Sequence, residues 1–128
     1  MRDLIKALKA LSDPNRMRIM KMLQRREMCV CELAEVLGIS QPSVSRHMRI
    51  LLEADLVSSR REGTWIHYLW NPHPSSYATD LLERLEKWLE QDPHIEALIQ
   101  KAAAVNPERI CRSPSRRSAG RTIGKAGT

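Results

Sequence analysis

The sequence contains no phenylalanine, and only two tyrosines and three tryptophans among its 128 residues. A hydrophobic core must therefore be built from leucine, isoleucine, valine and methionine. No stretch reaches the roughly 18 consecutive apolar residues that a membrane-spanning helix needs, so we expect no membrane contact. The N-terminal residues carry charges throughout and show no cleavable apolar segment, which argues against a signal peptide and favours the cytoplasm.

Cysteine is scarce, and catalytic patterns are lacking. Three cysteines do not make a disulfide framework, and in the cytoplasm we expect them to be reduced thiols. No nucleophile–base pair, phosphate-binding loop or carboxylate pair is visible, so the sequence does not predict an enzyme. Residues 1–61 hold 12 Lys or Arg against 7 Asp or Glu, whereas residues 62–108 hold 3 against 8. This asymmetry predicts a first half that faces nucleic acid and a second part that faces away from it.

A helix-turn-helix unit is predicted over residues 31–54. Its first helix ends at Gly38, which can adopt the left-handed backbone that terminates helices. The second begins after Ser40, a good N-cap, with Pro42 in the first turn. Two helices joined by a tight glycine-containing turn are typical of DNA-binding proteins.

The outer face of the second helix carries the side chains expected to read DNA. The major groove admits one α-helix, and side chains near its N-terminus reach the base edges. Gln can pair with adenine, Arg with guanine, and Ser with either. The candidates are Ser40, Gln41, Ser43, Ser45, Arg46, His47 and Arg49.

Two short β-type runs follow within residues 56–70, joined by a turn at residues 62–64. A hairpin directly after a recognition helix forms a wing, and its Arg60 and Arg61 are placed to contact phosphate or enter the minor groove. The sequence therefore predicts a mainly α fold with a small β-hairpin, a winged helix-turn-helix. The alternative is a helical core whose basic face is only solvated. That alternative does not explain why an N-cap precedes the second helix and a hairpin follows it.

The ends of the predicted domain, residues 1–104, are amphipathic. Residues 3–11 and 75–103 carry more apolar side chains than a domain this small can bury alone, so we expect these helices to form a homodimer interface. The alternative is that residues 75–103 cover the core of a monomer. Pro93 predicts a kink there or a split into two helices. Residues 105–128 become rich in Arg, Ser, Gly and Pro, which predicts a basic, disordered tail.

The stretch CVCELAEVLGISQPSVSRHMRILLEADLVSSRREGTWIHYLW closely resembles the ArsR/SmtB family of metal- and metalloid-responsive repressors. ALSDPNRMRIMKML resembles the second helix of that family, and the resemblance covers about residues 3–100. It implies a homodimer whose first and last helices pack across the two-fold axis. It also implies that operator DNA is held until an inducer binds. The operator would be palindromic, with half-sites about one helical turn apart.

Cys29 and Cys31 stand at the start of the first helix of the helix-turn-helix. On a regular helix, positions i and i+2 point about 200° apart. The two thiolates can therefore share one ion only if this turn unwinds or never forms. Thiolate-only ligation suits As(III) or Sb(III), whereas Zn(II) usually takes four ligands with some nitrogen. Taken alone, the pair could be a small apolar filler, and a disulfide between such close neighbours would be strained.

The resemblance sharpens the prediction for these thiols. Arsenic-responsive members carry Cys-Val-Cys at this helix, and many have a third cysteine three residues further on, where this chain has Ala34. Either two protein thiolates suffice, or Cys111 in the tail supplies the third. The resemblance implies a repressor released by arsenite or antimonite. The alternative is a same-fold sensor of Cd(II), Pb(II), Zn(II) or an oxidant.

Zinc-responsive members instead use Asp, His and Glu on the last helix. Asp92 and His94 match the first half of that motif, but Val105 stands where a histidine is expected, although Glu108 follows. The sequence therefore does not favour a zinc site there.

Overall fold

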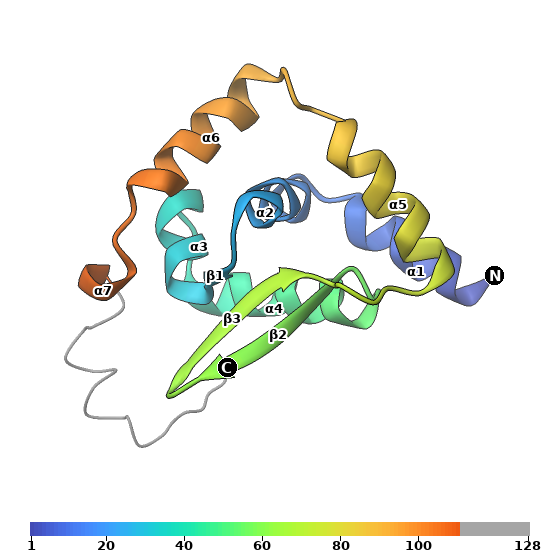
Figure 1. Ribbon diagram of the computed structural model, residues 1–128, viewed down its shortest axis with the longest axis horizontal. Coiled ribbons are helices and arrows are strands. Elements are labelled where there is room, and N and C mark those ends of the chain that lie inside the picture. Colours follow the sequence, from blue (N-terminus) through green and yellow to red (C-terminus); the bar gives the residue numbers. More distant parts are fainter. Residues whose placement is uncertain (111–128) are drawn as a thin grey trace.

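The structure is a computed structural model that describes residues 1–110. Within them the chain forms helices and one small sheet, in the fold class expected from the sequence. Figure 1 shows α2 at the centre of the helices and the β2–β3 hairpin extending away from them. The elements are α1 (Arg2–Leu11), α2 (Pro14–Arg25), β1 (Met28–Cys29), α3 (Val30–Leu37), α4 (Gln41–Glu53), β2 (Val57–Glu62), β3 (Trp65–Trp70), α5 (Ser76–Lys87), α6 (Pro93–Ala104) and α7 (Pro107–Ile110).

The sheet has one strand more than the sequence predicted. The hairpin is present, with β2 and β3 antiparallel, and β1 adds to the other edge of β3. Met28 pairs with Tyr68, and Cys29 pairs with His67. A strand of two residues is too short to show alternation of apolar and polar side chains, so no sequence pattern predicted β1. This third strand joins the hairpin to the start of α3.

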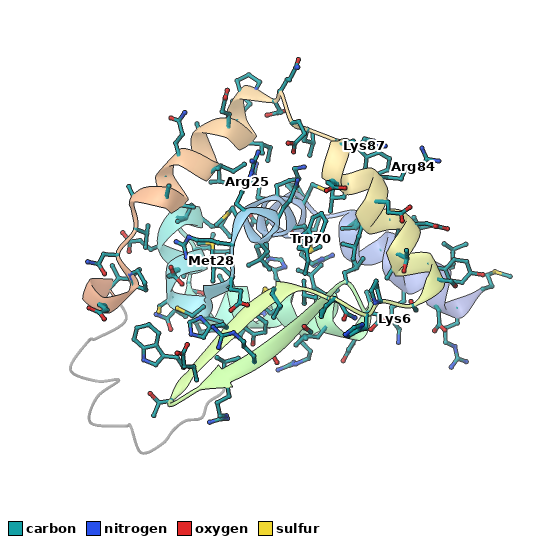
Figure 2. All side chains as sticks on the ribbon, viewed as in Figure 1. Lys6, Arg25, Met28, Trp70, Arg84 and Lys87 are labelled. Atoms are coloured by element: carbon teal, nitrogen blue, oxygen red, sulfur yellow. The ribbon has the colours of Figure 1, made fainter. Side chains whose placement is uncertain are left out.

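The large side chains of the core are mostly leucine, isoleucine, valine and methionine, as expected, and alanines and Tyr68 fill the rest. Trp70, labelled in Figure 2 beside α2, donates its indole N–H to the Met20 carbonyl at 2.8 Å. Lys21 of α2 is fully buried in this core. Its Nζ donates to the Leu85 carbonyl at 2.8 Å and to Glu90 Oε2 at 2.7 Å, which anchors the end of α5 on α2.

The predicted long C-terminal helix is split in two, the second of the options that Pro93 left open. α5 ends at Lys87, and Leu89 adopts a left-handed backbone with φ 64°. Pro93 then begins α6, and the Asp92 carboxylate accepts the His94 and Ile95 N–H groups at 2.9 and 3.1 Å. α6 turns back over α2 and α3 (Figure 1).

The expectation of disorder from residue 105 onward is wrong for its first residues. Pro107–Ile110 form the short helix α7, which packs against α3. Asn106 accepts the Glu108 N–H at 3.0 Å and so caps this turn. The rest of the predicted tail, including Cys111, lies outside the described residues.

The two helices expected at a dimer interface leave apolar side chains uncovered. α1 and α5 contact each other, yet large apolar side chains on α1, on α5 and just after it stay partly exposed. Leu8 and Trp88 are 46% and 47% exposed, and Ile5, Tyr77 and Leu89 share this property. No helix among residues 1–110 is long and apolar enough to cross a membrane.

Replacing Lys21 with methionine tests the anchor between α2 and α5. The Leu85 carbonyl would keep only the Trp88 N–H at 3.2 Å, and Glu90 would lose its bond to Lys21. The loss of the two charge-assisted bonds should cost about 1–3 kcal/mol. We expect K21M to lower the free energy of unfolding by that amount in urea titrations at fixed protein concentration. Lys87, exposed at the end of α5, provides the control K87M. Equal stability of K21M and K87M would show that the anchor contributes nothing.

Candidate DNA interface and thiol pair

The turn between α3 and α4 has the geometry expected of a helix-turn-helix. Gly38 adopts φ 71°, and its N–H reaches the Ala34 carbonyl at 2.8 Å. An L-residue with a side chain is strained in this region, which explains glycine here. Ser40 then caps α4 by accepting the Ser43 N–H at 3.2 Å. α3 and α4 pack against each other, so α3 supports the helix expected to read DNA.

The first two turns of α4 present a small polar cluster. Ser40 donates its hydroxyl to Ser43 Oγ at 2.9 Å, and Arg46 Nη2 donates to the same oxygen at 3.1 Å. Ser40, Arg46 and Arg49 are exposed, as is Gln41, whereas Ser43 is half-buried. Ser45, also half-buried, completes the candidates on this face. The cluster is free to exchange its internal hydrogen bonds for bonds to base edges.

The wing arginines differ in their surroundings. Arg60 Nε donates to Glu27 Oε1 at 2.6 Å, and Nη2 lies 3.4 Å from Glu62 Oε1. The hydrogen bond to Glu27 raises the pKa of the Arg60 guanidinium above its ordinary value. A phosphate would therefore compete with Glu27 for Arg60. Arg61 is exposed on the same strand.

His47 is the candidate whose surroundings depart most from the expectation. Its side chain is only 18% exposed. Nδ1 lies 3.1 Å from Nη1 of Arg16 on α2, and Nε2 lies 4.0 Å from Oδ2 of Asp13, the N-cap of that helix. The ring therefore faces the neighbouring helix, and the prediction that it contacts DNA stays a prediction.

The side chains of Cys29 and Cys31 converge, with their sulfurs 3.1 Å apart. From the sequence, we predicted that the two sulfurs can approach each other only if Cys29 lies outside the first helical turn. That condition holds, because Cys29 has extended backbone (φ −95°, ψ 170°) and α3 begins at Val30. The Glu32 carboxylate accepts the Cys29 N–H at 3.0 Å and fixes this conformation. Burial raises the pKa of the Cys29 thiol to about 11, and the Glu32 charge adds to the effect.

The distance between the two sulfurs can be compared with the geometry of a shared soft ion. With ion–sulfur bonds of about 2.3 Å, as in zinc thiolates, sulfurs 3.1 Å apart subtend roughly 85° at a shared ion. That angle is narrower than a tetrahedral one and suits three bonds arranged around a lone pair, as in As(III). No group of three Cys, His, Asp or Glu side chains within residues 1–110 could hold a metal ion. Asp92 is used as a helix cap instead.

With this geometry established, comparisons with known proteins are informative. A model of the arsR family of bacterial regulatory proteins matches residues 13–59. The arsenical resistance operon repressor of Escherichia coli is 34% identical over 103 residues, which cover 80% of this chain and 86% of that protein. The chain belongs to the arsR family. It is thus a regulator of the ArsR type, a class of DNA-binding repressors rather than enzymes.

Solved structures with the same fold support the assignment. The transcriptional repressor BigR from Xylella fastidiosa aligns with a TM-score of 0.59 at 29% identity, covering 71% of this chain and 88% of BigR. The homodimeric winged helix-turn-helix domain of Mb0332 from Mycobacterium bovis also gives 0.59, covering 72% of this chain and 82% of that one. Its identity is 23%, so it speaks for the fold alone.

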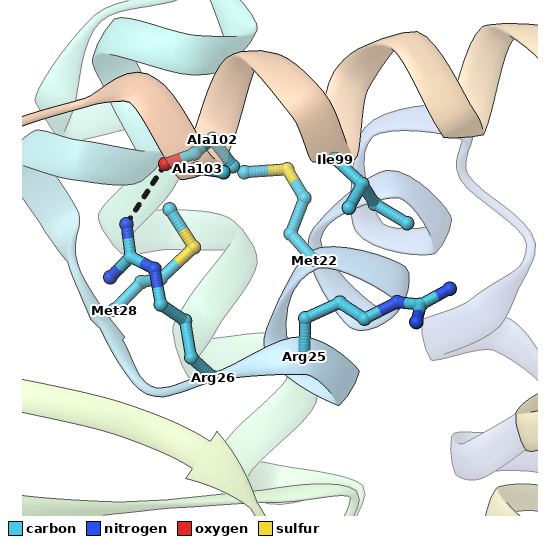
Figure 3. Close-up of a pocket in the computed structure, with 7 residues that line it drawn as sticks. All are labelled: Met22, Arg25, Arg26, Met28, Ile99, Ala102 and Ala103. Atoms are coloured by element: carbon cyan, nitrogen blue, oxygen red, sulfur yellow. Dashed lines mark hydrogen bonds between the residues drawn. The ribbon is translucent and has the colours of Figure 1, made fainter.

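The ArsR-type site includes residues that the sequence analysis did not single out. Glu27 holds a wing arginine, and Glu32 shapes the backbone at Cys29. Arg26 donates to Glu32 Oε2 at 2.8 Å and to the Ala102 carbonyl at 3.0 Å (Figure 3). The only local signal was Glu32, three residues after Cys29, which matches the spacing of a capping box.

Proposed function

We propose that this ArsR-family chain is a homodimeric repressor that leaves its operator when arsenite binds to Cys29 and Cys31. The observation that carries the proposal is the 3.1 Å separation of the two sulfurs beside the helix-turn-helix. The E. coli relative, named an arsenical resistance operon repressor, supports arsenic as the inducer. Antimonite, with the same valence and preference for sulfur, is the second inducer we expect.

A homodimer accounts for the uncovered apolar side chains on α1 and α5. Leu8 and Trp88 are nearly half exposed, and together with Ile5 and Tyr77 they would be covered by a second copy. A two-fold dimer presents two recognition helices to one face of DNA. It therefore calls for a palindromic operator.

DNA contacts are assigned by what each side chain can reach. Ser40, Gln41, Ser43, Ser45, Arg46 and Arg49 on α4 face outward or sideways at the surface, where the major groove would lie. Arg61 and Arg60 on the wing are proposed to contact the backbone or minor groove. The α4 cluster supplies base readout, and the wing supplies charge.

The position of the thiols connects an ion to both DNA-contacting elements. Cys29 belongs to β1, which pairs with β3 of the wing, and Cys31 belongs to α3, which packs on α4. Shifting these two residues to satisfy an ion therefore displaces the edge of the wing sheet and the support of the recognition helix. Either displacement weakens operator binding.

Cys111 is proposed as the third thiolate, with a two-thiolate site as the alternative. The support comes from α7, which packs against α3, the helix that carries Cys31. Residue 111 follows Ile110, the last residue of α7, directly in the sequence. One residue spans about 3.8 Å, so the proposal requires a reach of only one residue beyond the helix that packs on α3.

The chemistry of neutral thiols favours arsenite over divalent metals. Arsenous acid is uncharged, and each new As–S bond replaces an As–O bond while the thiol proton leaves with the hydroxide as water. A divalent cation must instead displace a proton from each thiol. The pKa of Cys29, raised to about 11 by burial, makes that displacement unfavourable near pH 7.

Alanine substitutions separate base readout from charge. R46A should weaken operator binding by about 1–3 kcal/mol and relax the preference for one base position, because a bidentate contact would be lost. R61A should weaken specific and non-specific binding alike and lower the salt slope by about one. Fluorescence anisotropy at several salt concentrations measures both.

The control for these variants is R84A on α5, which lies far from the hairpin in Figure 2. R84A should bind DNA like the wild type. If R46A and R61A behaved identically, with equal losses on every duplex, the division between reading helix and wing would be wrong.

Cysteine variants test the inducer site. We expect C29S and C31S to bind the operator normally but not to release it with arsenite, because each loses one of the two paired sulfurs. V30A, which keeps both thiols, is the matched control. C111S should need more arsenite if Cys111 is a ligand, and should respond like the wild type if two thiolates suffice. Full release from the C29S/C31S double variant would refute the proposal.

The pH dependence of binding separates arsenite from divalent metals. Because the Cys29 thiol stays protonated up to well above pH 8, arsenite affinity should change less than about twofold between pH 6.5 and 8.0. Cadmium affinity should rise by about tenfold per pH unit for each displaced proton. Isothermal titration in two buffers of different ionisation enthalpy reports the protons released. Equal proton release with both ions would contradict the neutral-thiol chemistry.

A further inference from the structure

The guanidinium of Arg16 joins three helices. Arg16 lies in the first turn of α2. Its Nε donates to the Ala10 carbonyl at 2.7 Å, and its Nη2 donates to the Lys9 carbonyl at 3.2 Å. Both carbonyls belong to the last turn of α1, and the Lys9 carbonyl also accepts the N–H and the hydroxyl of Ser12. The third nitrogen, Nη1, lies 3.1 Å from His47 Nδ1 on α4.

His47 is held by α2 on both sides of its ring. Arginine only donates, so Nδ1 accepts from Arg16 and the neutral ring carries its proton on Nε2. Nε2 faces Asp13 Oδ2 at 4.0 Å. That same oxygen caps α2, because it accepts the Asn15 and Arg16 N–H groups at 2.9 and 3.1 Å. The ring therefore rests on a group that is itself fixed.

We propose that Arg16 and His47 form a joint that fixes the recognition helix α4 relative to α1 and α2. Both would then be positioning residues for operator binding. The inference rests on the proposed dimer, in which α1 lies at the interface. Two recognition helices must meet half-sites about one helical turn apart. A fixed connection from the interface helix to α4 keeps that separation.

The pH dependence of operator binding, through protonation of His47, distinguishes the joint from a direct contact between His47 and DNA. Burial lowers the pKa of His47; Asp13 opposes this effect, and Arg16 and Arg46 add to it. These are the charged groups that face the ring, from α2 and from α4 itself. The lowered pKa keeps the ring neutral near neutral pH. Protonation in acid removes the acceptor and places a cation against Arg16.

The two roles of His47 predict opposite responses to acid. A histidine that touches phosphate or a base acceptor binds DNA more tightly when protonated. A joint binds the operator less tightly, because α4 loses its fixed position. Burial raises the pKa of Asp13, but the N–H groups of Arg16 and Asn15 and the charges of Arg16 and His47 outweigh it, so the pKa lies below its ordinary value. Asp13 therefore stays ionised in this range and does not obscure the response.

The experiment measures anisotropy of a duplex that the wild-type protein selects from a randomised pool, with an unrelated duplex beside it, at pH 7.5 and 5.5 and constant ionic strength. We expect wild-type affinity for the selected duplex to fall in acid. H47L should lose about tenfold at pH 7.5, the size of one charge-assisted hydrogen bond. H47N places an amide oxygen where Nδ1 lies, so it should recover most of this affinity and lack the acid response.

A double-mutant cycle then tests whether the two residues act together. R16M and R16M/H47L should lose specific affinity to the same extent, since either change breaks the joint. R18M is the matched control, because Arg18 lies on the same helix and bonds only to Asn15 among the hydrogen bonds described. Thermal unfolding identifies a misfolded R16M, in which case the H47L and H47N pair decides.

Three results would overturn the joint: affinity that rises in acid, losses that add in the double variant, or H47N as weak as H47L. A wild-type protein that selects no duplex would instead contradict the proposed DNA-binding function. The assay contains no arsenite, so a failed arsenite response leaves the outcome for the joint unaffected.

Discussion

The hydrogen bond from the Cys29 N–H to the Glu32 carboxylate, 3.0 Å long, sets the geometry on which the proposed inducer site depends. It holds Cys29 in extended backbone, where the residue pairs with His67 of β3. A helix begun at Cys29 would point the two thiols about 200° apart. Because α3 begins at Val30, the sulfurs meet at 3.1 Å. One residue therefore belongs both to the wing sheet and to the cap of α3.

Glu32 can hold this position because its own charge is compensated. The side chain is 2% exposed and pairs with Arg26 at 2.8 Å. An unpaired carboxylate so deeply buried would cost several kcal/mol. Arg26 also donates to the Ala102 carbonyl, which ties α6 to the same point. The next residue, Glu27, holds Arg60 of the wing. The segment before the thiols thus connects α3, α6 and the hairpin.

What the sequence could predict was decided by the range of each interaction. The cap at Ser40 and the turn at Gly38 involve hydrogen bonds over three or four residues. The residue types at these positions are therefore enough to predict them. Pro93 predicted an interruption of the C-terminal helix. The Asp92 cap, which starts a new helix, distinguishes a split into two helices from a kink. The bond between Arg16 and His47 spans 31 positions. The sequence analysis placed His47 on the DNA-facing side of its helix only because histidine is polar. No local pattern shows that its ring instead bonds to a residue on a neighbouring helix.

The two sides of α4 are held in different ways, and this constrains how an inducer can act. On one side, Arg16 bonds to the end of α1 and to His47. On the other, the thiol pair lies on β1 and α3, and β1 pairs directly with the wing. A displacement that starts at Cys29 passes directly to β3, because Cys29 pairs with His67 of that strand. If arsenite acts at this pair, the wing is therefore the first DNA-contacting element to move, and α4 follows only as far as its joint to α2 allows.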